Sequence, residues 1–471
     1  MIKHVRTFFL CVSTLACIPG CYPKRIVWSP DGQRAAICSD HGLFFTDAQG
    51  TLSAKVHDNV GRAQWFPDSQ HLAIAKDLSA LTWNEVETKF PAKLREDLVR
   101  YAQALCHVTD KTQWQAGVNQ LLNEHVISEN ELRGIKLYIR DNTPKGFPTD
   151  LIDSWQDECV FHCHSLRIGL WQENTFSVKK ILFSSPQEIR DIRVSPKGRL
   201  LAFTTIFAKK ENGEDRNINS LWVADAETDK VVLLDTNVSL YPDWDAQGTS
   251  LVYVRSLDNI GSDSAIGTLL LSPICDERGI LLSDLLSPPV ALAGLVANEH
   301  VKVRCLSDGR IVFSSFELTL PFVQNDIPGF PQFFILDTKQ QATITRLIPR
   351  SVLPQVQGYN LGFFEVSPDE SILAFPDGDG RVAALSLATG DFVVLQDADL
   401  GEISAVPVWR YPGDLCYIDK PSDGLPTKNA HKEVVLRQMT QSNGWGNPRS
   451  ISRNWPDIAK NEWLQQEKNK K

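Results

Sequence analysis

The sequence predicts an all-β fold, a seven-bladed β-propeller with a mostly helical insertion in the second blade. Two observations lead to this prediction: a short turn motif recurs seven times, and one interval between its copies is much longer than the others. A chain of 471 residues is too long for one small domain but suits one large repeat fold. We assign residues 21–460 to the propeller and residues 84–164 to the insertion.

The turn motif joins two apolar segments. In its first copy Val27-Trp28 precedes Ser29-Pro30-Asp31-Gly32, and Ala35-Ala36-Ile37 follows. Proline fixes φ, aspartate accepts hydrogen bonds from the turn backbone, and glycine tolerates positive φ, so the motif predicts a β-hairpin. The six further copies have their turns at 66–69, 195–198, 245–248, 306–309, 367–370 and 410–413.

A second polar turn between apolar segments follows in most copies, for example at 225–229 and 388–391. Two hairpins per copy make a four-stranded blade, and seven blades close radially with few exposed edges. Four copies place tryptophan at the same position just before the turn: Trp28, Trp65, Trp244 and Trp409. The tryptophans thus occupy one equivalent position of the blade, in line with the rigid aromatic packing that is common in β-structure.

The insertion follows from the spacing of the turns. Positions 69 and 198 are 129 residues apart, whereas a blade of this kind takes about 40–45 residues. After Pro91 the apolar positions recur with helical spacing, and Ser128 to Glu131 has the spacing of a capping box. We expect two or three helices on the propeller rim, either as a structural elaboration or as a partner-docking module.

The N-terminus has the pattern of an export signal. Lys3 and Arg6 precede an apolar stretch, Phe8 to Ile18, which is too short for an ordinary membrane-spanning helix. Ile18-Pro19-Gly20-Cys21 resembles a bacterial lipobox. This resemblance implies removal of residues 1–20, lipidation of Cys21, and an exported, membrane-anchored lipoprotein at the cell envelope, at the outer membrane or the periplasmic face.

The Trp-Ser-Pro-Asp-Gly-x-x-Leu-Ala-Phe style of repeat resembles the WD40-like propellers of the TolB type, over about residues 26–453. The resemblance implies a scaffold whose face and central channel bind partner proteins or peptides. TolB-type proteins carry an α/β domain before the propeller, whereas here we expect the first blade to begin within a few residues of Cys21. Some related propellers are carbohydrate lyases with a metal at the channel mouth, and this implies an enzymatic alternative.

One cluster, Cys159-Val-Phe-His162-Cys163-His164, has residue types that ligate zinc or copper. Its spacing matches no standard zinc finger. The alternative is a disulfide that joins Cys106 to Cys159 or Cys163, because an exported protein is exposed to oxidising conditions. Such a bond would connect the insertion to the propeller.

Charge and missing motifs limit the function. A net charge of −9 argues against a broad nucleic-acid surface. The chain has no Gly-x-Ser-x-Gly nucleophile motif and no phosphate-cradling glycine motif, so we assign no catalytic residue and no cofactor. We expect a monomeric, non-catalytic scaffold that binds an envelope protein or a glycan, followed by a polar tail at 461–471. The alternative is a lyase-like, carbohydrate-active enzyme.

Overall fold

A computed structural model describes the chain from residue 26 to residue 452 with internal gaps. The described residues are 26–39, 42–108, 110–123, 127–143, 145–155, 159–211, 214–256, 265–282, 288–297, 300–316, 331–339, 343–348, 364–377, 381–399, 407–411, 413–419, 433–438, 444–447 and 449–452. The predicted signal at 1–20, the lipidation site Cys21 and the tail at 461–471 lie outside these ranges.

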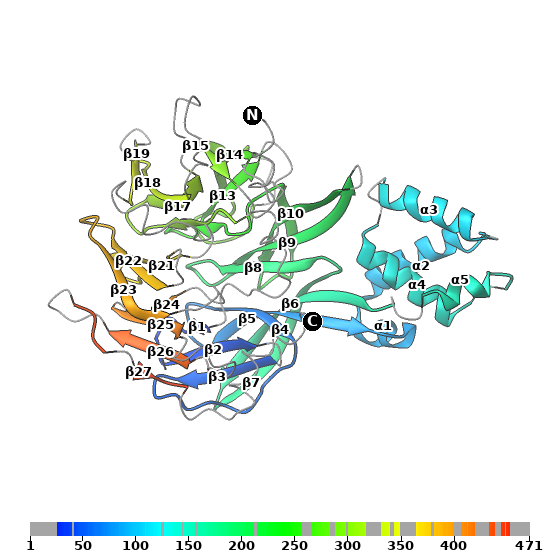
Figure 1. The fold of residues 1–471 in the computed structure, drawn as a ribbon, viewed down its shortest axis with the longest axis horizontal. Helices are drawn as coiled ribbons and strands as arrows, with labels where there is room; N and C mark the ends of the chain where they lie inside the picture. The colour runs from blue at the N-terminus through cyan, green and yellow to red at the C-terminus, as the bar shows by residue number, and fades with distance from the viewer. Residues whose placement is uncertain are drawn as a thin grey trace, which may run out of the picture.

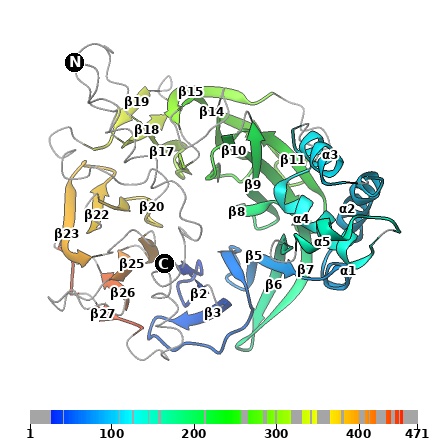
Figure 2. The same ribbon diagram turned by 45° about the vertical axis from the view of Figure 1, so that its right-hand side comes forward.

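The strands form antiparallel sheets arranged in a ring, as Figure 2 shows. The first sheet contains β1 (Ile26–Trp28), β2 (Arg34–Ser39) and β3 (Gly42–Asp47). The second contains β4 (Val60–Trp65), β5 (His71–Ala80), β6 (Phe161–Gln172) and β7 (Thr175–Ser185). The third contains β8 (Glu188–Val194), β9 (Leu200–Glu211), β10 (Glu214–Asp225) and β11 (Val231–Thr236).

The fourth sheet is the largest and has eight strands. It contains β12 (Asp243–Trp244), β13 (Ser250–Ser256), β14 (Ala265–Pro273), β15 (Val290–Ala297), β16 (Val303–Cys305), β17 (Arg310–Phe316), β18 (Pro331–Asp337) and β19 (Thr343–Arg346). The fifth contains β20 (Glu365–Val366), β21 (Ile372–Pro376), β22 (Arg381–Ser386) and β23 (Phe392–Asp399). The sixth contains β24 (Val408–Tyr411), β25 (Asp414–Asp419), β26 (Glu433–Gln438) and β27 (Arg449–Ser450).

The fold is an all-β propeller, but the predicted number of seven blades is wrong. The described strands form six sheets, because the fourth and fifth repeats of the turn motif share one sheet. Strand β15 of the fourth repeat pairs with β17 of the fifth at Val296 and Phe316. The turn motif marks the start of a hairpin, and it does not determine where one sheet ends and the next begins.

The repeated turns have the backbone conformation that the motif predicts. Gly32, Gly198 and Gly248 have φ values of 62°, 74° and 64° at the last turn position. Ser69 and Glu370 fill the same position in two other copies and also have positive φ, at 58° and 59°. The turn geometry is therefore kept even where glycine, which adopts it without strain, is absent.

Three of the repeated tryptophans connect neighbouring sheets. The indole Nε1 of Trp65 donates to the carbonyl of Val27 at 2.9 Å, from the second sheet to the first. Trp244 donates in the same way to Arg193 at 3.0 Å, and Trp409 donates to Glu365 at 3.2 Å. Buried hydrophobic clusters fill the spaces between adjacent sheets around the ring.

The ring closes between the sixth sheet and the first. The Tyr411 hydroxyl donates to the carbonyl of Asp31 at 2.7 Å, and Arg410 Nε donates to the carbonyl of Gly32 at 2.8 Å. The Arg410 guanidinium also lies 5.4 Å from the centre of the Trp28 ring. The seam is thus held by side chains, and the first and sixth sheets share no strand among the described residues.

In the described part of the chain, five helices follow β5 and precede β6, and they lie at one side of the ring (Figure 1). They are α1 (Trp83–Lys89), α2 (Ala92–Leu105), α3 (Lys111–Asn123), α4 (Glu129–Asp141) and α5 (Thr149–Asp153), and we call them the helical module. Two or three helices were expected here. Residues 161–164, assigned to the insertion from the sequence, belong to strand β6.

We predict that Trp244→Phe lowers the free energy of unfolding by about 1–3 kcal/mol, because it leaves the buried carbonyl of Arg193 without its indole donor. Urea unfolding monitored by circular dichroism would measure the change. Trp171→Phe is the matched control, since the buried Trp171 ring packs on Phe45 and its indole nitrogen makes no hydrogen bond with the described residues. Equal destabilisation by the two variants would contradict the prediction.

Candidate functional site

The helical module has its own hydrophobic core, and this core continues into the second sheet. Leu98, Ile135 and Trp155 are buried in it together with Phe161 and Cys163 of β6. The module is therefore packed on the extended ends of β5 and β6 and is not suspended on flexible linkers. Burial of this apolar surface fixes the module relative to the propeller.

Asn130 at the start of α4 adds a polar connection between the module and the sheets. Its Nδ2 donates to the carbonyls of His162 at 2.6 Å and Pro186 at 3.0 Å. Its Oδ1 accepts from the backbone N–H of His162 at 2.9 Å. The predicted capping box is confirmed, with reciprocal hydrogen bonds between Ser128 and Glu131 at the N-terminus of α4.

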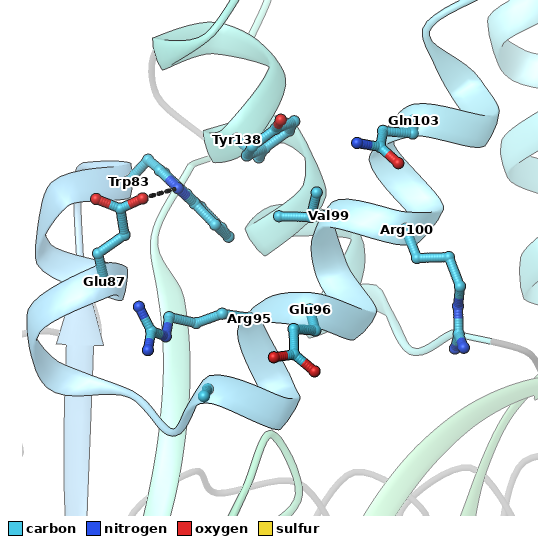
Figure 3. A pocket seen from close by; sticks show the side chains of 9 residues that line it. Trp83, Glu87, Arg95, Glu96, Val99, Arg100, Gln103 and Tyr138 are labelled. Atoms are coloured by element: carbon cyan, nitrogen blue, oxygen red, sulfur yellow. Dashed lines mark hydrogen bonds between the residues drawn. The ribbon is translucent and has the colours of Figure 1, made fainter.

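The module carries a pocket of about 400 Å³ between α1, α2 and α4 (Figure 3). The lining residues come from these three helices: Trp83, Glu87, Ala92, Arg95, Glu96, Val99, Arg100, Gln103 and Tyr138. The Trp83 and Tyr138 rings meet edge to face, with centroids 4.9 Å apart. Trp83 Nε1 donates to Glu87 Oε1 at 2.9 Å, which orients the Glu87 carboxylate at one wall.

The two arginines of the pocket differ in their partners. Arg100 pairs with Asp97 at 2.9 Å, and its guanidinium lies 4.9 Å from the centre of the Tyr101 ring. Arg95 has a buried Nε without a hydrogen-bond partner, and its side chain makes no ion pair with the described residues. An unpaired buried donor on a charged group is costly, so Arg95 is the group in this pocket that a ligand would satisfy.

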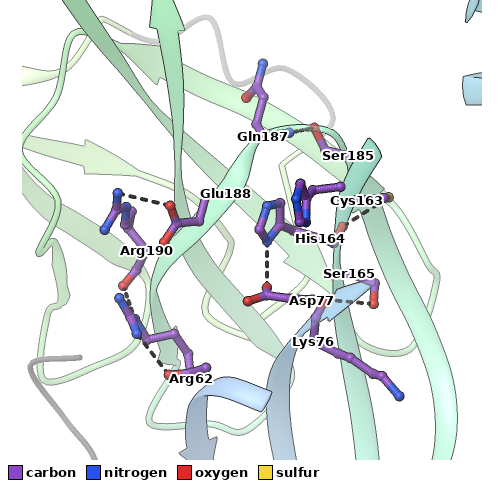
Figure 4. A network of polar contacts seen from close by, with 12 residues as sticks. Arg62, Lys76, Asp77, Cys163, His164, Ser165, Ser185, Gln187, Glu188 and Arg190 are labelled. Carbon is purple, nitrogen blue, oxygen red and sulfur yellow. Dashed lines mark hydrogen bonds and ion pairs between the residues drawn. The ribbon is translucent and has the colours of Figure 1, made fainter. Parts of the chain in front are cut away.

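A polar cluster lies beside the module, where the second and third sheets meet (Figure 4). Asp77 Oδ1 and His164 Nδ1 are 2.6 Å apart, and only 13% of the His164 side chain is exposed. Glu188 and Arg190 of β8 form an ion pair at 3.0 Å, and Arg62 Nε donates to the carbonyl of Arg190 at 2.8 Å. When a carboxylate orients an imidazole through Nδ1, the other ring nitrogen, Nε2, is left for proton transfer.

The structure separates the four candidate metal ligands. Cys159 and Cys163 are buried in the module core, whereas His162 and His164 lie on the opposite face of β6 from Cys163 and are partly exposed. Burial raises the pKa of Cys163 to about 12, which keeps it a thiol. In the part of the chain that the structure describes, no group of three His, Cys, Asp or Glu side chains could hold a metal ion.

The predicted disulfide is not formed in the structure, because Cys106 and Cys163 are free thiols. Cys106 packs against the same hydrophobic cluster that contains Cys159 and Cys163, so the pairing stays a prediction for oxidising conditions. Asp77 and Arg95 were not found from the sequence. Asp77 is 87 residues from His164, and no local pattern links them.

No protein-family model and no curated protein sequence matches the chain. Among solved structures it is similar to the tricorn protease, at 11% identity and a TM-score of 0.41, over 77% of this chain and 29% of that chain. It is similar to an oligogalacturonate lyase in complex with manganese, at 9% identity and a TM-score of 0.47, over 90% of this chain and 89% of that chain.

A third similar structure is an Agrobacterium tumefaciens protein described as TolB, at 12% identity and a TM-score of 0.35, over 58% of this chain and 83% of that chain. These identities and TM-scores are low. The function of the chain is therefore argued from its own residues.

We predict that Asn130→Ala loosens the module while the propeller stays folded. Loss of three hydrogen bonds to β6 and Pro186 should speed amide exchange in α4 by about tenfold or more. Hydrogen–deuterium exchange read by mass spectrometry measures this directly. Asn119→Ala, at an exposed site on α3, is the control; unchanged exchange of residues 129–141 in Asn130→Ala would refute the anchoring role.

We predict that acid destabilises the protein partly through His162. Burial, and then the positive charges of His164 and Arg133, lower the pKa of His162 below its ordinary value of 6.5. The unfolded chain therefore binds the proton more readily, and stability falls as the pH drops below about 6.5. Melting temperatures of His162→Gln should fall less between pH 7.5 and 5 than those of the wild type. An identical pH dependence would show that His162 does not contribute.

Proposed function

We propose that this chain is a lipid-anchored cell-envelope propeller that binds a protein or glycan partner and catalyses no reaction itself. The observation that carries the proposal is the helical module, which shares its core with the second sheet and has an open pocket on its surface. In this proposal the propeller is the scaffold and the module is the part that meets the partner.

The attachment of the module supports a binding role. The continuous core with Phe161 and the Asn130 hydrogen bonds hold the helices in one orientation before any partner arrives. A preformed surface loses less conformational entropy on binding than a mobile one, so more of the contact energy contributes to affinity. A module kept only to complete the propeller would need no such pocket between its helices.

The proposed location at the cell envelope is based on the N-terminal residues that precede the described chain. The basic Lys3 and Arg6, the apolar stretch and Ile18-Pro19-Gly20-Cys21 together support export and lipidation. Within the described residues, none of the helices is long and apolar enough to cross a membrane.

One observation favours the enzymatic alternative. The Asp77–His164 pair lies beside the module and has the geometry of a carboxylate-oriented imidazole, which is suited to acid–base chemistry on a carbohydrate. Stoichiometric metal in the purified protein, together with loss of polysaccharide cleavage in His164→Gln, would favour this alternative over the binding scaffold.

We predict that a photo-crosslinking residue at Gln103, on the module, captures one defined envelope component in intact cells, because this position borders the pocket. The same residue at the exposed Lys339, on the propeller, serves as the control. The captured species is separated on gels with protease and glycosidase treatment, which tells protein from glycan. Equal capture from both positions, or from neither, would contradict a partner-binding module.

The anchor is tested in the same cells. Labelling with radioactive palmitate should be lost in Cys21→Ala, because Cys21 is the residue to which the lipobox directs the lipid; Cys17 is the weaker alternative site. Unchanged labelling would show that Cys21 is not the lipidation site, and it would contradict the proposed anchor at this residue.

A further inference from the structure

We propose that the pocket of the helical module binds a peptide carboxylate that is attached to an apolar side chain. This inference rests on the proposed function, since it names the chemistry that the module would recognise. Three features of the pocket carry it: an unpaired guanidinium, two carboxylates in the same lining, and small apolar side chains on one wall.

The unpaired guanidinium supplies the attraction for an anion. Arg95 extends from α2 toward α1 (Figure 3), and its Nε is shielded from water without an acceptor. Arg100, the other cation of the pocket, already pairs with Asp97. A ligand carboxylate would give Arg95 the charge-assisted hydrogen bonds that no described residue gives it.

The two carboxylates decide which anion fits. Glu87 and Glu96 both line the pocket with Arg95, and Figure 3 shows the Arg95 guanidinium on the side of Glu87. Glu87 is held in place by Trp83 Nε1 at 2.9 Å and makes no ion pair with Arg95. A singly charged carboxylate can pair with Arg95 beside these groups, whereas the greater charge of phosphate at neutral pH is repelled more strongly. The pocket therefore selects a monoanion.

The remaining wall of the pocket determines which group the carboxylate of the ligand can be attached to. Ala92 and Val99 present small apolar surfaces, and the volume of about 400 Å³ lies in the range of small-ligand pockets. Trp83 is only 5% exposed, so its ring offers little surface for a sugar to stack on, and the partly exposed Tyr138 packs edge to face against Trp83. An apolar amino-acid side chain beside a carboxylate fits this wall better than a uronic acid does.

The test uses the full mature chain and four probes in ligand-observed NMR titrations. N-acetyl-phenylalanine carries the carboxylate and the apolar group, and its amide is the neutral counterpart. Glucuronate tests a sugar as the source of the carboxylate, and inorganic phosphate tests a more highly charged anion. We expect the first probe to bind at least about tenfold more tightly than the other three.

Arg95→Gln should weaken binding of N-acetyl-phenylalanine by about tenfold or more, while Arg133→Gln, at an exposed arginine of α4 outside the pocket, should not. Unfolding curves of both variants check that the module is folded. Equal binding of the amide, preference for glucuronate or phosphate, or unchanged binding by Arg95→Gln would each overturn the inference.

The outcomes separate this inference from the proposed function. Selective capture at Gln103 that persists in Arg95→Gln, with no binding of N-acetyl-phenylalanine, would overturn the carboxylate site and leave the scaffold proposal standing. Carboxylate binding that depends on Arg95 without any captured component would support the site and count against the partner-binding role.

Discussion

The arrangement of the whole ring depends on a hydrogen bond between neighbouring inner strands. An indole N–H on one strand reaches the backbone carbonyl of the strand before it, at Val27, Arg193 and Glu365. A carbonyl at the inner edge of a sheet has no strand partner on that side, and leaving it buried and unpaired costs free energy. The tryptophan therefore gives this carbonyl a hydrogen-bond donor. It also sets the distance between neighbouring sheets at which the hydrophobic clusters between them can pack.

Where tryptophan is missing, charged groups replace it. Asp243 accepts from the backbone N–H of Cys305 at 2.9 Å and lies 3.2 Å from Arg304 on the neighbouring inner strand. Lys302 pairs with Glu365 at 2.6 Å, again between inner strands of different repeats. Buried pairs of this kind contribute more to a unique register than to stability, since desolvation offsets much of their attraction.

The sequence predicts those features that local chemistry determines. The hairpin turns follow from Pro, Asp and positive φ, and they tolerate Ser69 because the flanking strands impose the turn. The number of sheets is a long-range property, decided by the pairing of Val296 with Phe316, to which the turn motif does not contribute. Likewise, Cys163 and His164 are neighbours in sequence, and this suggests a shared metal site. In a strand, neighbouring side chains point to opposite faces, so the two residues do not lie together. Helical periodicity finds the buried face of α2, but it does not show that Arg95 lacks a partner.

The seam between the first and sixth sheets has a consequence for the order of assembly. No sheet in the described chain combines strands from its two ends, so each sheet can form as soon as its own segment has emerged from a ribosome or a translocation pore. Ring closure through Tyr411 is then the final step. The second sheet is the exception, because β6 follows β5 only after the whole helical module has been released. The module thus delays the formation of the second sheet, and the folding of the module is coupled to the folding of that sheet.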